Sequence, residues 1–283
     1  MIGQFLITFR EVLEAALTIA IILSYFSRTG RRNLSRYTWY GIFLAVAVSV
    51  GSGAIVWFAY GILPEASQTL FEAVAAFVAV AVLSSMIYWM AVKGRYLRQE
   101  MEQRIEAITT RGAIVGLVSV AFIVVFREGL ETVLFLTPFM LTDTAATLTG
   151  MLAGIAASVA LAYVMFVAGM KINLRNFFYF TSILLILLAG GLAGYGTHES
   201  MEYFENIGVN MGWLGRPAYV LSIPADSPLH DNGAIGSVLA VMFGYTVSAE
   251  WSRVIVHLAY LAVAMPLVIW VYRKEDEKRP GGT

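Results

Sequence analysis

Residues 9–17 read Phe9-Arg10-Glu11-Val12-Leu13-Glu14-Ala15-Ala16-Leu17, and residues 126–134 read Phe126-Arg127-Glu128-Gly129-Leu130-Glu131-Thr132-Val133-Leu134. Six of the nine positions are identical, and they include the motif Arg-Glu-x-x-Glu. Each copy places three ionisable side chains inside an otherwise apolar stretch. A charge near the centre of a bilayer costs about 2.5–3.5 kcal/mol on insertion scales. Because the chain carries this cost in two nearly identical stretches, we expect the charges to have a function.

The composition is that of a helical membrane protein. The chain is 59% hydrophobic and 13% charged, whereas an ordinary soluble domain carries about 25% charged residues. Its apolar runs have the length of membrane-spanning helices, about 20 residues, and are not the short alternating strands of a barrel. The net charge of zero gives no basis for a nucleic-acid partner, and the absence of cysteine excludes disulfides and thiolate metal ligands.

The apolar runs predict seven membrane-spanning helices, and the basic residues alternate with them. These residues follow the first, third, fifth and seventh spans: Arg28, Arg31, Arg32 and Arg36; Lys93, Arg95, Arg98, Arg104 and Arg111; Lys171 and Arg175; and Arg273, Lys274, Lys278 and Arg279. Because cytoplasmic loops carry the excess of Lys and Arg, the N-terminus is predicted outside and the C-terminus in the cytoplasm. We therefore expect an all-α, multi-pass protein of the cytoplasmic membrane.

The two motifs fall in the first and fourth spans, which this topology orients in opposite directions. The prediction is two inverted three-helix repeats plus a seventh helix, an architecture in which substrates bind near the midplane. The expected units are residues 1–92, the first repeat; 93–112, a cytoplasmic connector; 113–196, the second repeat; 197–250, an extracytoplasmic loop; and 251–283, the seventh helix and its tail.

The motif places two carboxylates on one face of each helix, because residues three apart are neighbours on a helix surface. Glu11 and Glu14 would meet Glu128 and Glu131 in an oxygen-rich cage suited to hard or borderline cations. Arg10 and Arg127 would balance part of the charge. With all six groups ionised the site carries two negative charges, which a divalent ion neutralises and a trivalent ion exceeds by one. Crowded carboxylates also share protons, so metal binding would displace protons.

Paired Arg-Glu-x-x-Glu motifs in the first and fourth of seven spans resemble the high-affinity iron permease family, seven-helix transporters of iron or lead. The segment Gly236…Phe243-Gly244-Tyr245 is similar to a Gly…Gly-Tyr stretch of that family. The resemblance implies that the motif residues form the permeation site for Fe3+ or Fe2+, with no permanently bound cofactor. It also implies an extracytoplasmic oxidase or peroxidase and an iron-binding protein as partners. Val12 stands where the family commonly has glycine, which the second copy keeps at Gly129.

Further candidates have two interpretations each. The acidic row after the sixth span is either an outer capture site or a solvated turn: His198, Glu199, Glu202 and Glu205. Glu72 lines the route to the site or marks the membrane interface. His257 lies on the pathway or makes an interhelical hydrogen bond.

Three functions remain open at this point. The first is a permease, for iron or for another hard or borderline cation such as Mn2+ or Pb2+. The second is an intramembrane metal-dependent enzyme, which is less favoured because neither motif contains histidine. The third is a receptor or energy-transducing subunit that uses the charges only as buried ion pairs. We expect a transporter and not an enzyme.

Overall fold

The computed structural model describes residues 1–93, 103, 105–107, 114–166, 174–224, 226–231, 233 and 235–277. Most of the predicted connector 93–112 lies outside the described residues, and so do several of the predicted cytoplasmic basic residues: Arg95, Arg98, Arg104, Arg111, Lys171, Lys278 and Arg279.

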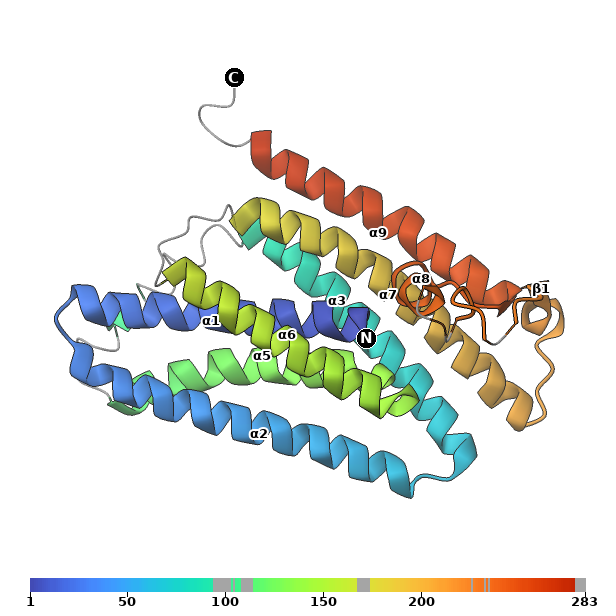
Figure 1. The fold of residues 1–283 in the computed structure, drawn as a ribbon, viewed down its shortest axis with the longest axis horizontal. Coiled ribbons are helices and arrows are strands. Elements are labelled where there is room, and N and C mark those ends of the chain that lie inside the picture. The colour runs from blue at the N-terminus through green and yellow to red at the C-terminus, as the bar shows by residue number, and fades with distance from the viewer. Residues whose placement is uncertain are drawn as a thin grey trace.

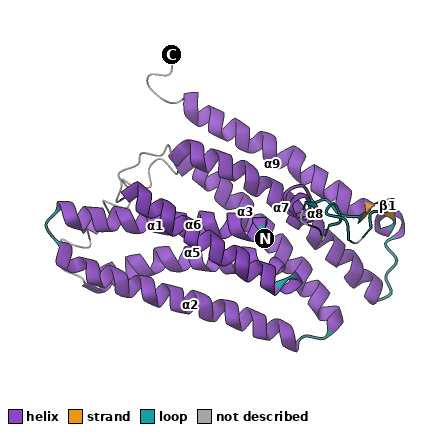
Figure 2. Ribbon diagram, in the orientation of Figure 1, coloured by secondary structure: helices purple, strands orange, loops and turns teal. Residues whose placement is uncertain are grey.

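Long helices make up nearly all of the described chain (Figures 1 and 2). They are α1 (Ile2–Arg28), α2 (Ser35–Ile62), α3 (Glu65–Lys93), α5 (Ile114–Thr142), α6 (Thr144–Phe166), α7 (Leu174–Asn206) and α9 (Trp251–Glu277). Their directions alternate across the view in Figure 1, so α1 and α5 run in opposite directions. The turns follow local rules: Leu63, for example, ends α2 in an extended conformation because it precedes Pro64.

Five of the described helices are long and apolar enough to cross a membrane, judged by length and composition. They correspond to α2, α3, α6, α7 and α9. The motif helices α1 and α5 are not among them, because every stretch of either helix that is long enough to cross includes several charged residues. The protein is therefore a multi-pass, all-α membrane protein, and the two helices that carry the charges are the exceptions to its apolar pattern.

Helices α1, α2 and α3 of the first half of the chain pack mainly on helices α5, α6 and α7 of the second half. The most extensive helix contacts are those of α2 with α5, of α3 with α7 and of α1 with α6. The first helix of each half thus packs on the second helix of the other half, and the two third helices pack on each other. The motif helices α1 and α5 also touch directly.

The second helices of the two halves carry the same stripe of small and hydroxyl residues. On α2 it consists of Thr38, Gly41, Ala45 and Ser49, and on α6 of Thr147, Gly150, Gly154 and Ser158. All eight residues are buried. Small residues at this spacing let helix backbones approach closely, and here each stripe faces the motif helix of the other half.

The two stripes meet equivalent backbone positions. A Cβ at Gly150 would collide with α1 at Met1, Gln4 and Phe5. A Cβ at Gly41 would collide with α5 at Val118, Ala121 and Phe122. Phe9 and Phe126 are the first residues of the two repeated stretches, and the three residues met on α1 and on α5 lie at the same distances before them in the sequence. The two motif helices are therefore held by the same type of close contact.

The stretch after α7 is more ordered than predicted. Helix α7 continues to Asn206, so the row from His198 to Glu205 lies on helical turns and not in the expected irregular loop. Beyond it are a 3-10 turn η2 (Gly212–Gly215), a short helix α8 (Gly236–Phe243) and a two-stranded antiparallel ribbon formed by β1 (Pro217–Val220) and β2 (Ser248–Glu250). Helix α8 lies within the predicted loop and, at eight residues, is too short to cross a membrane.

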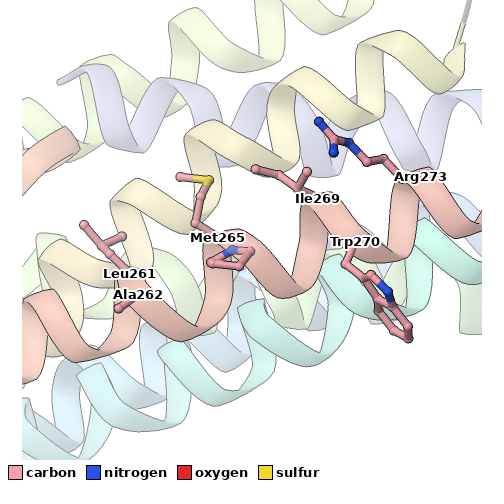
Figure 3. A pocket seen from close by; sticks show the side chains of 7 residues that line it. Leu261, Ala262, Met265, Ile269, Trp270 and Arg273 are labelled. Atoms are coloured by element: carbon pink, nitrogen blue, oxygen red, sulfur yellow. The ribbon is translucent and has the colours of Figure 1, made fainter.

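A shallow, mostly apolar hollow of about 490 Å³ lies along α9, lined by Leu261, Ala262, Met265, Pro266, Ile269, Trp270 and Arg273 (Figure 3). It contains no acidic residue, so this hollow offers no carboxylate ligand to a cation.

Candidate metal centre

Three motif glutamates converge where α1 meets α5. Glu11, Glu128 and Glu131 each offer one carboxylate oxygen to a group whose members lie within 4.8 Å of one another. Glu11 is fully buried, Glu128 is 8% exposed, and the side chain of Glu131 is 14% exposed. The predicted meeting of the two motifs is thus present in the structure, with three carboxylates in the tight group.

Arg10 binds both acidic residues of its own motif. Its Nη1 donates to Glu11 Oε1 at 2.8 Å, and its Nη2 lies 2.7 Å from Glu14 Oε1. The contact with Glu14 is an ion pair whose angles do not form a hydrogen bond. Arg10 is 1% exposed. Glu14 is therefore drawn toward Arg10, and it does not belong to the convergent group.

Arg127 makes a different arrangement from the same motif. Its Nε donates to Glu131 Oε1 at 2.8 Å, and its side chain is 45% exposed. Its guanidinium carbon lies 5.1 Å from the centroid of the Trp89 ring. Arg127 thus holds one carboxylate where Arg10 holds two.

Helix α3 contributes two residues that sequence reasoning missed. Met86 accepts an N–H of Arg10 on its Sδ at 2.7 Å, and Trp89 lies one turn further along, under Arg127. Neither is ionisable and both are distant from the motifs in sequence. Their spacing of three on one apolar helix was the only available signal, and that spacing is common in any packed helix.

Each of the three convergent carboxylates has one oxygen that accepts no hydrogen bond within the described residues. The Oε2 atoms of Glu11, Glu128 and Glu131 are buried and have no hydrogen-bond partner within the described residues. Buried polar atoms are normally hydrogen-bonded, and an unsatisfied one calls for an explanation such as an ion. Three carboxylates that approach within 4.8 Å, each with an unpartnered oxygen, fit a hard or borderline divalent cation, which takes carboxylate ligands.

A second group of possible ligands lies at the far end of α7. His198, Glu199 and Glu202 offer ligand atoms within 4.8 Å of one another. His198 Nδ1 is also 2.9 Å from Glu250 Oε1 on β2, a residue not singled out from the sequence. Glu205 is not part of this group. The helical continuation of α7 therefore brings together three of the four predicted outer residues.

Glu72 and His257 have partners other than these two groups. Glu72 on α3 accepts hydrogen bonds from Tyr60 of α2, at 2.5 Å, and from Tyr195 of α7. Through these bonds Glu72 joins the three helices α2, α3 and α7. His257 of α9 packs against Gly190 of α7 and against Gly244, the left-handed residue that ends α8. His257 thus sits at a helix contact.

The fold and site define a helical membrane protein with a buried carboxylate centre between two helices of opposite direction. Comparison with known proteins gives the family. The model of the iron permease FTR1 family matches residues 1–270. The chain therefore belongs to this family of iron permeases, and it is a membrane transporter of iron and not an enzyme.

Similar proteins extend over almost the whole chain. An uncharacterized protein of Archaeoglobus fulgidus is 43% identical, with 98% of each chain covered. The ferrous iron permease EfeU of Escherichia coli O6:H1 is 32% identical, with 94% of each chain covered. EfeU of Yersinia pestis is 30% identical, over 94% of this chain and 93% of that protein. No solved structure matches.

Proposed function

We propose that this protein imports Fe2+ across the cytoplasmic membrane through the centre formed by Glu11, Glu128 and Glu131. The observation that carries the proposal is the convergence of three carboxylates whose Oε2 atoms are buried and unpartnered. The charge supports a divalent ion: four glutamates and two arginines leave two negative charges when all are ionised. The EfeU relatives, named ferrous iron permeases, support the same choice of oxidation state.

We infer further that the protein has seven spans, with α1 and α5 as the first and fourth, and that residues 1–93 and 114–206 form inverted repeats. Three features support this topology: the alternating helix directions, the exchanged packing of the halves, and the matched contacts of Gly41 and Gly150. The paired ion site would then lie near the midplane, as in other transporters built from inverted repeats. The positive-inside rule supports an outer N-terminus and a cytoplasmic C-terminus.

In this topology the two arginines flank the centre on opposite sides. Arg10 precedes Glu11 on a helix that enters from outside, whereas Arg127 precedes Glu128 on a helix that enters from the cytoplasm. Arg10 is buried and Arg127 is half exposed. A guanidinium at this depth needs water or a polar cavity. We infer that water reaches Arg127 from the cytoplasmic side, whereas Arg10 is closed off from the outside.

The group of His198, Glu199 and Glu202 is proposed as a capture site at the outer mouth. Glu199 of this group is close enough to Glu72 for the two carboxylates to interact electrostatically. A cation would pass Glu72 on its way to the centre. An extracytoplasmic iron-binding protein would deliver Fe2+ there; an oxidase or peroxidase would supply Fe3+ and fits only the alternative of ferric transport. The membrane potential favours import, because each positive charge gains about 2.3 kcal/mol per 100 mV.

Uptake into proteoliposomes tests the proposal. Purified protein is reconstituted, an inside-negative potential is imposed, and anaerobic Fe2+ uptake is compared with uptake of Fe3+, Mn2+ and Pb2+. Glu128→Gln should abolish Fe2+ uptake. The matched control is Glu65→Gln, a change to an exposed residue at the start of α3, which should transport normally. Normal Fe2+ uptake by folded Glu128→Gln would rule out this centre as the pathway.

A further inference from the structure

The two copies of the motif differ in whether the arginine forms an ion pair with the glutamate that follows it. Arg10 Nη1 binds Glu11 Oε1 at 2.8 Å, which shows that the arginine of this motif can reach the glutamate that follows it. The equivalent pair in the second copy is Arg127 and Glu128. Within the described residues Glu128 has neither a hydrogen bond nor an ion pair. The same sequence therefore produces a paired glutamate in one copy and an unpaired one in the other.

Pairing would be expected on energetic grounds. A buried carboxylate without a partner is costly, and a nearby guanidinium is the best partner that a protein offers. Glu128 is 8% exposed and its Oε2 atom is buried. Arg127 is adjacent in sequence and has N–H groups to spare, since only its Nε is engaged with Glu131. The ion pair with Glu131 holds the Nε side of the guanidinium, and a second contact acts on its face.

Trp89 supplies that interaction. The Arg127 guanidinium carbon lies 5.1 Å from the centroid of the Trp89 ring, within the range of a cation–π contact, for which tryptophan is the strongest partner. Trp89 is itself fixed by packing against the cluster of Leu13, Leu17, Met90 and Phe178. Leu13 and Leu17 of this cluster belong to α1, so Trp89 packs against a cluster that includes the helix of the first motif and also contacts the arginine of the second.

The first copy has no aromatic residue in this position. Arg10 contacts the Met86 sulfur instead, one turn earlier on the same helix. A thioether is a weak acceptor, so it does not compete with two carboxylates for the guanidinium. Helix α3 therefore offers a weak thioether acceptor to Arg10 and an aromatic ring to Arg127.

We propose that Trp89 is a positioning residue for the cation centre: it holds the Arg127 side chain away from Glu128 and so keeps the Glu128 carboxylate available to the metal. The inference rests on the proposed function, because it assigns a partner to one residue of that centre. In the first copy Arg10 occupies Glu11 Oε1 and Glu14 Oε1, whereas in the second copy the buried Oε2 of Glu128 has no hydrogen-bond partner in the described residues and is available to the ion. The second motif is then the principal metal-accepting half of the centre.

Fluorinated tryptophans at position 89 test this inference without changing the size of the ring. Fluorine withdraws electron density from the ring face and weakens cation–π attraction in steps. The measurement is the dissociation constant for Fe2+, by anaerobic titration of the full-length protein in lipid nanodiscs. The constant should rise with each added fluorine, to about tenfold for the most substituted ring, as expected for loss of one cation–π contact. The same series at Trp270 of α9 (Figure 3), whose ring centroid lies 4.6 Å from Lys274 Nζ, is the matched control and should be flat.

The Arg127→Gln background separates positioning from packing. If Trp89 acts through Arg127, the fluorine series loses its slope once the guanidinium is gone, whatever affinity that background has. A slope that persists without Arg127, or a flat series in the wild type, overturns the inference. Glu128→Gln distinguishes this failure from a failure of the proposed function: the function fails if that variant binds Fe2+ normally, and only the positioning role fails if binding is lost but the series is flat.

Discussion

Glu11 on α1 and Glu128 on α5 bring carboxylate oxygens within 4.8 Å of each other, although the residues lie in different halves of the chain. Each is buried, and each has an Oε2 atom without a hydrogen-bond partner in the described residues. Two like charges at this distance repel. The two carboxylates therefore destabilise the empty site and attract an incoming cation. We expect this property of a transport site.

The four motif glutamates should not contribute equally. Glu14 lies outside the convergent group and is paired with Arg10. We predict that Glu14→Gln weakens Fe2+ binding by about tenfold or less, the value of one indirect electrostatic contact. Glu11→Gln, Glu128→Gln and Glu131→Gln each remove a ligand and should weaken it by at least about a hundredfold. Titrations of the four variants give the order; a Glu14→Gln protein as weak as Glu128→Gln would show that all four act as ligands.

The two arginines should differ in their effect on stability. Removing one partner of a buried ion pair costs about 3–5 kcal/mol, because the other charge is left uncompensated. Arg10 is 1% exposed and binds two carboxylates, whereas the Arg127 side chain is 45% exposed and binds one. Thermal unfolding in detergent should therefore show a large loss for Arg10→Gln and a clearly smaller one for Arg127→Gln. Equal losses would mean that the two sites are equally buried in solution.

The matched stripes on α2 and α6 should respond alike to a larger side chain. Gly41→Leu would force α2 from α5, and Gly150→Leu would force α6 from α1, because each Cβ meets backbone of the motif helix. We expect both variants to lose stability and metal binding together. Gly51→Leu on α2 is the control, since nothing lies within 4 Å of a Cβ there. If only one of the two glycines were sensitive, the equivalence of the halves would not extend to their packing.

Ile123 offers a test of water access to Arg127. It lies one turn before Arg127 on α5 and is 61% exposed. The natural sequence contains no cysteine, so Ile123→Cys provides a single reactive thiol. A charged, membrane-impermeant thiol reagent should label it from the cytoplasmic side of inverted membrane vesicles but not from outside intact cells. Failure to label from either side would mean that this face of α5 contacts lipid.

Much of the site was predictable because its chemistry is unusual for a membrane. Three charges in an apolar stretch, repeated in nearly identical form, single out Arg10, Glu11, Glu14, Arg127, Glu128 and Glu131 as candidates without any structure. The helix period places the glutamates of each motif on one face, and the alternation of basic loops orients the helices. These inferences depend on patterns that are local in the sequence.

The remainder depends on contacts between distant residues. The motifs are alike, so nothing in them distinguishes the buried Arg10 from the half-exposed Arg127; that difference comes from Met86 and Trp89 on α3. The helix that contains the predicted sixth span extends beyond residue 196, because the glutamates after Thr197 resemble a loop in the sequence but continue α7 to Asn206. The stripes on α2 and α6 were visible in the sequence, but small residues occur in most membrane helices and only the contacts of Gly41 and Gly150 give them meaning.

Anomalous diffraction at the iron edge, from crystals grown anaerobically with Fe2+, measures the position of the metal directly. We predict one strong peak between α1 and α5, bonded to carboxylate oxygens of Glu11, Glu128 and Glu131. Iron found only at His198, Glu199 and Glu202, with nothing between the two motif helices, would contradict a transport centre in the membrane interior.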